Sequence, residues 1–130
     1  MISEDWRNRK IEDERNAFKA SIGACMVCDD RWRNGPFPRC LEVHEISRGA
    51  ARQRSLKVRA SWLLLCRRHH ELVSTFSVVR QLALKFLADP EWYDAAVVNE
   101  LRKRSELAIT DGDVLEELPF IRAVIAGDFG

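Results

Sequence analysis

Two pairs of side chains in the sequence have the residue types and the spacing of a zinc site. Cys25 and Cys28 are separated by two residues, and Cys66 and His69 repeat that spacing after 37 intervening residues. Two residues between ligands let one tight turn present both side chains to one ion, and two such turns complete the tetrahedron that zinc prefers. Cys40 lies outside both pairs and is expected to be a small buried apolar residue. We therefore predict a structural Zn(2+) at the four paired residues. The alternative is that the cysteines are unrelated core residues. Disulfide bonds are a weaker explanation, because the cytosol keeps thiols reduced.

Basic residues concentrate in the middle of the chain. The 130 residues have a formal net charge of only +1, yet residues 31–70 carry ten basic and two acidic side chains, a balance of +8. The flanking segments 1–30 and 71–130 have balances of −2 and −5. A basic segment suits a phosphate-binding surface because neutralised phosphates release condensed counterions. The alternative is a solvated arginine-rich loop that pairs with the acidic C-terminal part. The candidate nucleic-acid contacts are Arg48, Arg52, Arg54, Lys57 and Arg59.

The composition is that of a soluble globular protein, with 46% hydrophobic and 32% charged residues. The first residues contain no apolar signal region. The longest apolar run, Trp62–Cys66, has five residues, whereas a membrane span needs about twenty. We expect a cytoplasmic protein with no membrane partner, folded as a single domain over 1–130.

The expected fold is α+β and mostly α, and the elements around the first cysteine pair follow from local patterns. The charged segment Ser3–Ser21 lacks Gly and Pro and predicts a helix, with Ser3 as its cap. Breakers between Ala24 and Arg39 predict a loop. Alternation over Cys40–His44 and the apolar run Trp62–Leu65 predict two strands, separated by the basic stretch Ser47–Ser61.

Three further helices are expected after Cys66. The spacing of Val79, Leu82 and Phe86 predicts the first, which ends near Asp89. Asp89-Pro90 is typical of an N-cap followed by proline at the first helical position, and it predicts a second helix. The apolar face of that helix is expected to comprise Tyr93, Val97 and Leu101, with Arg102, Lys103 and Arg104 in its last turn. Thr110 is expected to cap a short helix through Leu118, before Pro119.

The segment between the two cysteine-containing pairs resembles the HNH (ββα-metal) endonuclease family. The sequence LEVHEI over Leu41–Ile46, a glycine-containing loop, and SWLLLCRRHH over Ser61–His70 stand in the order found in that family. The match covers residues 25 to about 74. The sequence HEISRG from His44 and the downstream segment from Arg80 are also similar to small HNH-like proteins of bacteriophages. The resemblance implies a strand–loop–strand–helix finger whose ends are held by zinc, with a catalytic divalent ion at its centre, in a bacterial or phage-infected host cell.

The resemblance also assigns roles, but only some of the family's residues are present. His44 matches a metal ligand, and His70 matches the helix histidine that binds the same ion. Glu45 stands where the family has the histidine general base, although a carboxylate there could itself bind Mg(2+), Mn(2+) or another divalent ion. Ser61 and Ser74 occupy the places of an orienting Asn and a further metal ligand.

The same residues also have structural interpretations. His44 could hold a backbone carbonyl at the end of a strand, and Glu45 could pair with Arg48. His69 and His70 could exchange roles at the zinc.

Two functions follow from this pattern. One is a metal-dependent endonuclease with His44, Glu45 and His70 at its centre, for which we expect the nucleic acid to be DNA rather than RNA. The other is a degenerate finger that binds nucleic acid or a protein partner without cleaving. A second register of the resemblance would make His44 the base and place Val43 where an acidic ligand is expected. The chain divides into an N-terminal helix at 1–23, a zinc-knuckle core at 24–75 and a C-terminal helical region at 76–130, whose helices are a candidate surface for a protein partner.

Overall fold

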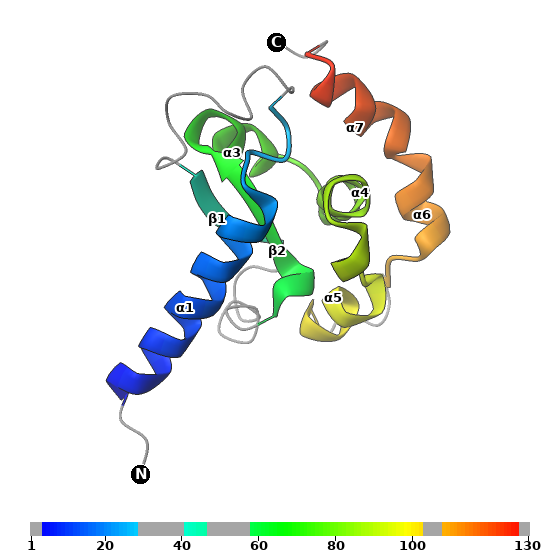
Figure 1. Cartoon of the computed structure of the whole chain (residues 1–130). Coiled ribbons are helices and arrows are strands. Elements are labelled where there is room, and N and C mark those ends of the chain that lie inside the picture. Colours follow the sequence, from blue (N-terminus) through cyan, green and yellow to red (C-terminus); the bar gives the residue numbers. More distant parts are fainter. Residues whose placement is uncertain (1–3, 29–40, 47–57, 103–107, 128–130) are drawn as a thin grey trace.

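The protein is a mostly helical α+β chain built around one antiparallel hairpin (Figure 1). The computed structural model describes residues 4–28, 41–46, 58–102 and 108–127. Among the helices described there, none is both long enough and apolar enough to cross a membrane. In chain order the elements are α1 (Glu4–Ile22), β1 (Leu41–Glu45), the 3-10 turn η4 (Arg59–Ser61), β2 (Trp62–Cys66), α3 (Arg67–Val73), α4 (Val78–Ala88), the 3-10 turn η5 (Pro90–Trp92), α5 (Ala95–Arg102), α6 (Asp111–Glu116) and α7 (Leu118–Ile125).

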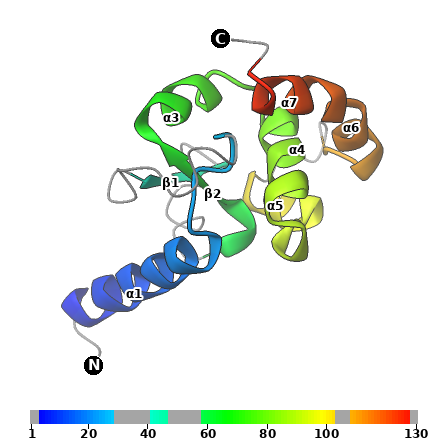
Figure 2. The ribbon, with the colours of Figure 1, turned by 45° about the horizontal axis from the view of Figure 1, so that its top comes forward.

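The hairpin lies between helix α1 and the remaining helices. Glu45 of β1 contacts Arg15 of α1 on one face, whereas His44 contacts α3 and α4 on the other. Helices α4 to α7 lie together in both ribbon views (Figures 1 and 2). The predicted strand–strand–helix order is confirmed, because α3 follows β2 without an intervening loop. The predicted N-terminal helix is also present as α1, while its expected cap, Ser3, is outside the described residues.

The two strands differ in burial, since β2 is buried along most of its length whereas β1 is only partly buried. All four residues from Trp62 to Leu65 are buried, as expected for a continuous apolar run. In β1 the pairing register places His44 opposite Leu63 and Glu45 opposite Trp62. Because side chains alternate along a strand, the even-numbered residues of β1 face one side of the hairpin and the odd-numbered residues face the other. This alternation decides which polar side chains of β1 can meet.

An apolar core joins the hairpin to the helices on both of its faces. Phe18, near the end of α1, packs edge-on against Trp62 with ring centroids 5.5 Å apart. Leu82 of α4 and Ile121 of α7 are each no more than 1% exposed and belong to the same cluster. Removal of this apolar surface from water is the main favourable term that holds the helices against the hairpin.

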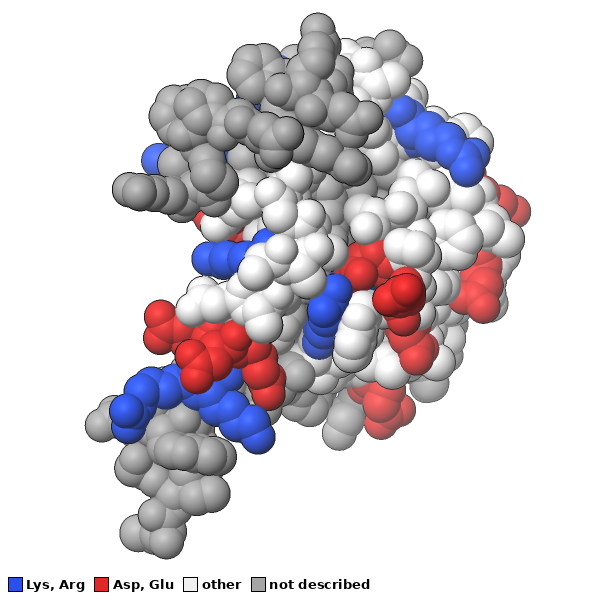
Figure 3. Space-filling model, in the orientation of Figure 1, with Lys and Arg blue, Asp and Glu red and all other residues white. Residues whose placement is uncertain are grey.

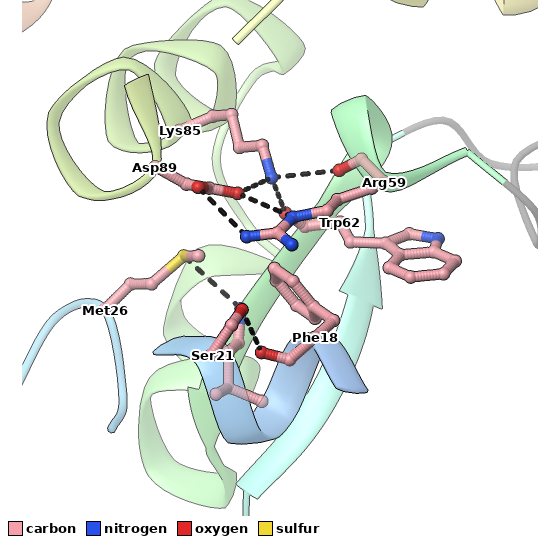
Figure 4. A network of polar contacts seen from close by, with 8 residues as sticks. Phe18, Ser21, Met26, Arg59, Trp62, Lys85 and Asp89 are labelled. Atoms are coloured by element: carbon pink, nitrogen blue, oxygen red, sulfur yellow. Dashed lines mark hydrogen bonds and ion pairs between the residues drawn. The ribbon is translucent and has the colours of Figure 1, made fainter. Parts of the chain in front are cut away.

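A buried lysine ties α4 to the start of β2 (Figure 4). The Lys85 side chain has no solvent exposure, and its Nζ donates to the carbonyl oxygens of Arg59 and Trp62 and to Asp89 Oδ2 at 2.9, 2.8 and 2.7 Å. These three contacts use all three donors of the ammonium group, which is what a charge needs in order to be buried. Burial nevertheless lowers the pKa of Lys85 to about 8, while Asp89 acts in the opposite direction. The Arg59 guanidinium contacts the same carboxylate at 3.4 Å.

The helix predicted to begin at Asp89-Pro90 does not begin there, because the Asp89 side chain bonds to Lys85 and Arg59 instead of capping a helix. Pro90 begins only the short turn η5, and Asp89 makes no capping hydrogen bond there. Helix α5 begins five residues later, with Asp94 Oδ1 accepting from the backbone N–H of Val97. Its buried residues are Ala95, Val98 and Leu101, so of the predicted face only Leu101 is fully buried. Lys103 and Arg104 are outside the described residues.

Two further predictions concern α4 and the C-terminal helices. The helix predicted from Val79, Leu82 and Phe86 is confirmed as α4. Thr110 caps α6 in a reciprocal capping box with Asp113, as the sequence indicates. However, α6 ends at Glu116, and a separate helix, α7, begins at Leu118 with proline in its first turn. Proline is tolerated in the first turn because the N–H groups there have no intrahelical acceptor, so Pro119 starts a helix where we expected an end.

We predict that Lys85→Met destabilises the protein by about 3–5 kcal/mol, the usual effect of removing one partner of a buried ion pair. The substitution leaves the Asp89 carboxylate buried with only its longer contacts to Arg59, and it leaves two carbonyl groups without their donor. Urea denaturation of the zinc-loaded protein measures the change.

The double variant Lys85→Met/Asp89→Leu is the matched control. Removal of both charges should recover much of the loss, because apolar replacement of both partners is close to neutral. A double variant no more stable than the single one would show that Lys85 acts through packing instead of through its charge.

Candidate metal centre

The ends of three elements bring four potential zinc ligands together. Helix α1 ends at Ile22 and is followed by Gly23, whose positive φ of 75° is typical of the glycine after a helix, and the chain then turns toward Cys25 and Cys28. Cys66 is the last residue of β2 and the N-cap of α3, and His69 lies in the first turn of that helix. Three cysteines and one histidine therefore converge at one point, and we call these four residues the Cys3His group.

Backbone contacts hold the first cysteine pair against the hairpin. The N–H of Met26 donates to the carbonyl of Leu64 at 2.8 Å, and the N–H of Leu64 lies 3.3 Å from the Met26 sulfur (Figure 4 shows Met26 beside the hairpin). The turn that carries Cys25 and Cys28 is therefore fixed to the strand that carries Cys66. These contacts hold Cys25 and Cys66, which are 41 residues apart in sequence, at fixed relative positions without the help of a metal ion.

The donor atoms of the Cys3His group are separated as the ligands of one tetrahedral zinc ion are. His69 Nδ1 lies 3.4, 3.4 and 3.3 Å from the sulfur atoms of Cys25, Cys28 and Cys66. The sulfur atoms of Cys28 and Cys66 are 3.9 Å apart. Tetrahedral zinc–ligand bonds of about 2.3 Å to sulfur and about 2.0 Å to nitrogen predict separations of about 3.5 Å between sulfur and nitrogen and about 3.8 Å between sulfurs. The group therefore fits zinc, and His69, not His70, is its histidine.

The protonation equilibria of the group couple metal binding to pH. Burial raises the pKa of the Cys25 thiol, and burial together with the neighbouring thiols raises the pKa of Cys28. Burial and the Arg68 charge lower the pKa of His69, which keeps its imidazole neutral and able to coordinate. The metal-free thiols of Cys25 and Cys28 are therefore protonated at neutral pH and must release protons when an ion binds.

A second polar cluster forms where β1 meets α3 and α4. His44 Nδ1 lies 3.1 Å from His70 Nε2, and the two rings are arranged edge to face with centroids 5.0 Å apart. The other nitrogen of His70 contacts Glu42 Oε2, and His44 Nε2 lies 2.7 Å from Gln81 Oε1. The structure thus brings together the two histidines that were predicted to share a divalent ion. We call them the histidine pair.

The third predicted catalytic residue does not join this pair. Glu45 follows His44 in β1, so its side chain faces the opposite side of the hairpin, where its carboxylate forms an ion pair with Arg15 of α1. Of the two serines at altered family positions, Ser61 is fully buried, and Ser74 donates its hydroxyl hydrogen to the backbone carbonyl of His70 at 2.6 Å.

The predicted nucleic-acid contacts are mostly outside the described residues. Arg48, Arg52, Arg54 and Lys57 fall in the segment 47–57, so their role stays a prediction. Arg59 is described, and its guanidinium is engaged inside the protein, against Asp89 and 4.8 Å from the centroid of the Trp92 ring. On the face shown in Figure 3, acidic and basic side chains are interspersed over the described surface.

Two members of the second cluster were not predicted from the sequence. Glu42 carries a detectable signal, since it lies two residues before His44 and a strand places both side chains on one face. Gln81 carries a weaker signal, because it reaches His44 from 37 residues away and lies outside residues 25 to about 74, where the HNH motifs are matched.

We predict that the purified protein contains about one zinc ion per chain and that Cys66→Ser weakens zinc binding by more than about 100-fold. His69→Ala should do the same, whereas His70→Ala should retain the ion. Because the raised thiol pKa values require proton release, the zinc affinity should fall as the pH is lowered. Elemental analysis and competition with a chromophoric chelator measure these effects.

Cys40→Ser is the control, since Cys40 belongs to neither ligand pair. A folded protein that is purified without metal and takes up no zinc would contradict the assignment. Loss of zinc in His70→Ala but not in His69→Ala would exchange the roles of the two histidines.

Comparisons with known proteins do not identify a family for this chain. No protein-family model, no curated protein and no solved structure matches it. The functional argument therefore depends on the residues themselves: a mostly helical α+β fold, an antiparallel hairpin, and a Cys3His group fit for zinc.

Proposed function

We propose that the chain is a metal-dependent nuclease of the HNH type, which hydrolyses DNA phosphodiester bonds at the histidine pair. The observation that carries the proposal is the 3.1 Å separation between His44 Nδ1 and His70 Nε2. Neighbouring ligands about 2.1 Å from one ion and at right angles to each other are about 3.0 Å apart. One histidine comes from the hairpin and the other from the helix that follows it, which is the arrangement that the sequence resemblance implies.

The surroundings of the pair suit a divalent ion. Glu42 contacts the outer nitrogen of His70, and a carboxylate in that position orients the ring and increases its basicity as a ligand. Two imidazole ligands favour transition-metal ions over Mg(2+), whose preferred ligands are oxygen atoms. When bound, such an ion supplies charge stabilisation at the phosphate and lowers the pKa of a coordinated water. The remaining ligands in this proposal are water and the phosphate oxygen atoms.

A specific observation favours the alternative, a finger that binds without cleaving. Glu45, which stands where the family has its general base, is held by Arg15 on the face of the hairpin away from the pair. For Glu45 to accept a proton from water at the ion, Arg15 must release its carboxylate. Glu45 is therefore not available as a positioned base as long as that ion pair persists.

We predict that the zinc-loaded protein nicks supercoiled plasmid when Mn(2+), Co(2+) or Ni(2+) is added, and that His44→Ala and His70→Ala each lower the rate more than about 100-fold. Each variant removes one of the two nitrogen donors while leaving the Cys3His group intact. Gel electrophoresis of the plasmid, together with zinc analysis of each variant, gives the result.

Glu71→Gln is the matched control, because Glu71 follows His70 on α3 and its side chain is 76% exposed. This variant should nick at the wild-type rate. Intact plasmid under every ion, with DNA still bound, would establish the binding module instead. If Glu45→Gln is as active as the wild type, Glu45 is not the base.

We further predict that the affinity for duplex DNA falls steeply with salt and that Arg52→Ala reduces the slope of log affinity against log salt by about 1, as expected for the loss of one phosphate contact. The physical reason is the basic balance of residues 31–70. Arg122→Ala on α7 is the control and should leave the slope unchanged. Binding that is insensitive to salt, or equal weakening in both variants, would contradict a phosphate-binding role for this segment.

A further inference from the structure

Gln81 of α4 connects the C-terminal helices to the histidine pair. Its side chain is buried, with 2% relative exposure for the residue. The Oε1 atom lies 2.7 Å from His44 Nε2, and Nε2 of the same amide donates to the carbonyl oxygen of Phe76 at 3.0 Å. Both ends of the amide therefore have a partner, and the orientation of the group has a single consistent solution.

That orientation determines which nitrogen of His44 carries a hydrogen. The Phe76 carbonyl can only accept, so the NH2 group of Gln81 must face it and Oε1 must face His44. Because Oε1 can also only accept, the hydrogen of the 2.7 Å contact belongs to His44 Nε2. In the neutral imidazole the other nitrogen, Nδ1, then has a lone pair, and Nδ1 is the atom that faces His70.

The same logic applies at the other end of the pair. The Glu42 carboxylate accepts from His70 Nδ1, so the lone pair of a neutral His70 lies on Nε2. Two lone pairs 3.1 Å apart repel each other unless a cation or a proton lies between them. The outer hydrogen bonds of the cluster thus prepare the two inner nitrogen atoms for a shared positive charge.

We propose that Gln81 is a positioning residue of the metal centre: it holds His44 in the Nε2-protonated tautomer and thereby directs Nδ1 toward the ion shared with His70. The inference rests on the proposed divalent ion at the histidine pair and adds helix α4 to that site. Lys85 lies four residues further along α4 and holds the same hairpin through the Trp62 carbonyl. One face of α4 therefore fixes both the strand and the tautomer of its histidine.

The tautomer can be observed without any measurement of cleavage. In spectra of the zinc-loaded protein with 15N-labelled histidine, His44 should show its hydrogen on Nε2, protected from exchange by Gln81. Gln81→Met removes the acceptor at similar volume, so this signal should be lost while the zinc content and the urea midpoint confirm folding. Calorimetric titration of the zinc-loaded protein with Ni(2+) should show a 10–100-fold weaker second site in this variant, the usual effect of losing a group that orients a ligand.

Gln81→Glu is the conservative control, because it retains an oxygen acceptor for His44 Nε2. It should keep the Nε2-bound hydrogen and a Ni(2+) affinity within about 3-fold of the wild type or stronger. A wild-type His44 with its hydrogen on Nδ1, or a Gln81→Met variant with unchanged tautomer and Ni(2+) affinity, would overturn the proposal. If both readouts behave as expected but the wild type does not nick DNA, the nuclease proposal fails and the role of Gln81 stands.

Discussion

Helix α3 sets the direction of the candidate ligands that follow the hairpin. Successive residues of an α-helix point about 100° apart, so the adjacent His69 and His70 cannot face the same ion. Because β2 ends at Cys66 and α3 begins at once, His69 is directed toward the cysteines and His70 toward His44 of β1. One strand-to-helix junction therefore orients two centres that lie side by side. Neither centre can be moved without displacing the other.

This sharing would give a zinc ion in the Cys3His group a role beyond stability. A chain of 130 residues can bury a core of its own, yet α3 has only seven residues, and a helix that short is not stable in isolation. The Cys3His group brings the first turn of α3 next to the segment after α1, and Met26 in that segment also donates to Leu64 of β2. Zinc would therefore hold the position of His70 as well as the fold. Helix α4 acts on the other member of the pair, since Gln81 contacts His44 directly.

The part of the fold that the sequence predicts is the part governed by local spacing. The two ligand pairs, the strands and the first turn of α6 depend on residues within a few positions of one another, and all of these are present. The error at Asp89 arises because a distant partner takes a side chain away from its local role. Asp89 is drawn to Lys85 and Arg59 instead of capping a helix, and only the folded chain brings Arg59 near. The polar residues Gln81 and Lys85 of α4 and Asp89 directly after it recur every fourth residue, and that pattern could have indicated a polar face directed at the hairpin.

The alternation of β1 limits what chemistry the histidine pair can perform. His44 and Glu45 both lie within the paired ladder, opposite Leu63 and Trp62, so they face opposite sides as long as that pairing persists. A positioned general base typically contributes about 10²–10⁴-fold to a hydrolytic rate. With Glu45 held by Arg15, Glu45 does not supply that contribution. In the proposed nuclease, activation of water would then rest on a bound ion, so the hydrogen bonds that Glu42 and Gln81 accept from the two histidines would matter more than in a site with its own base.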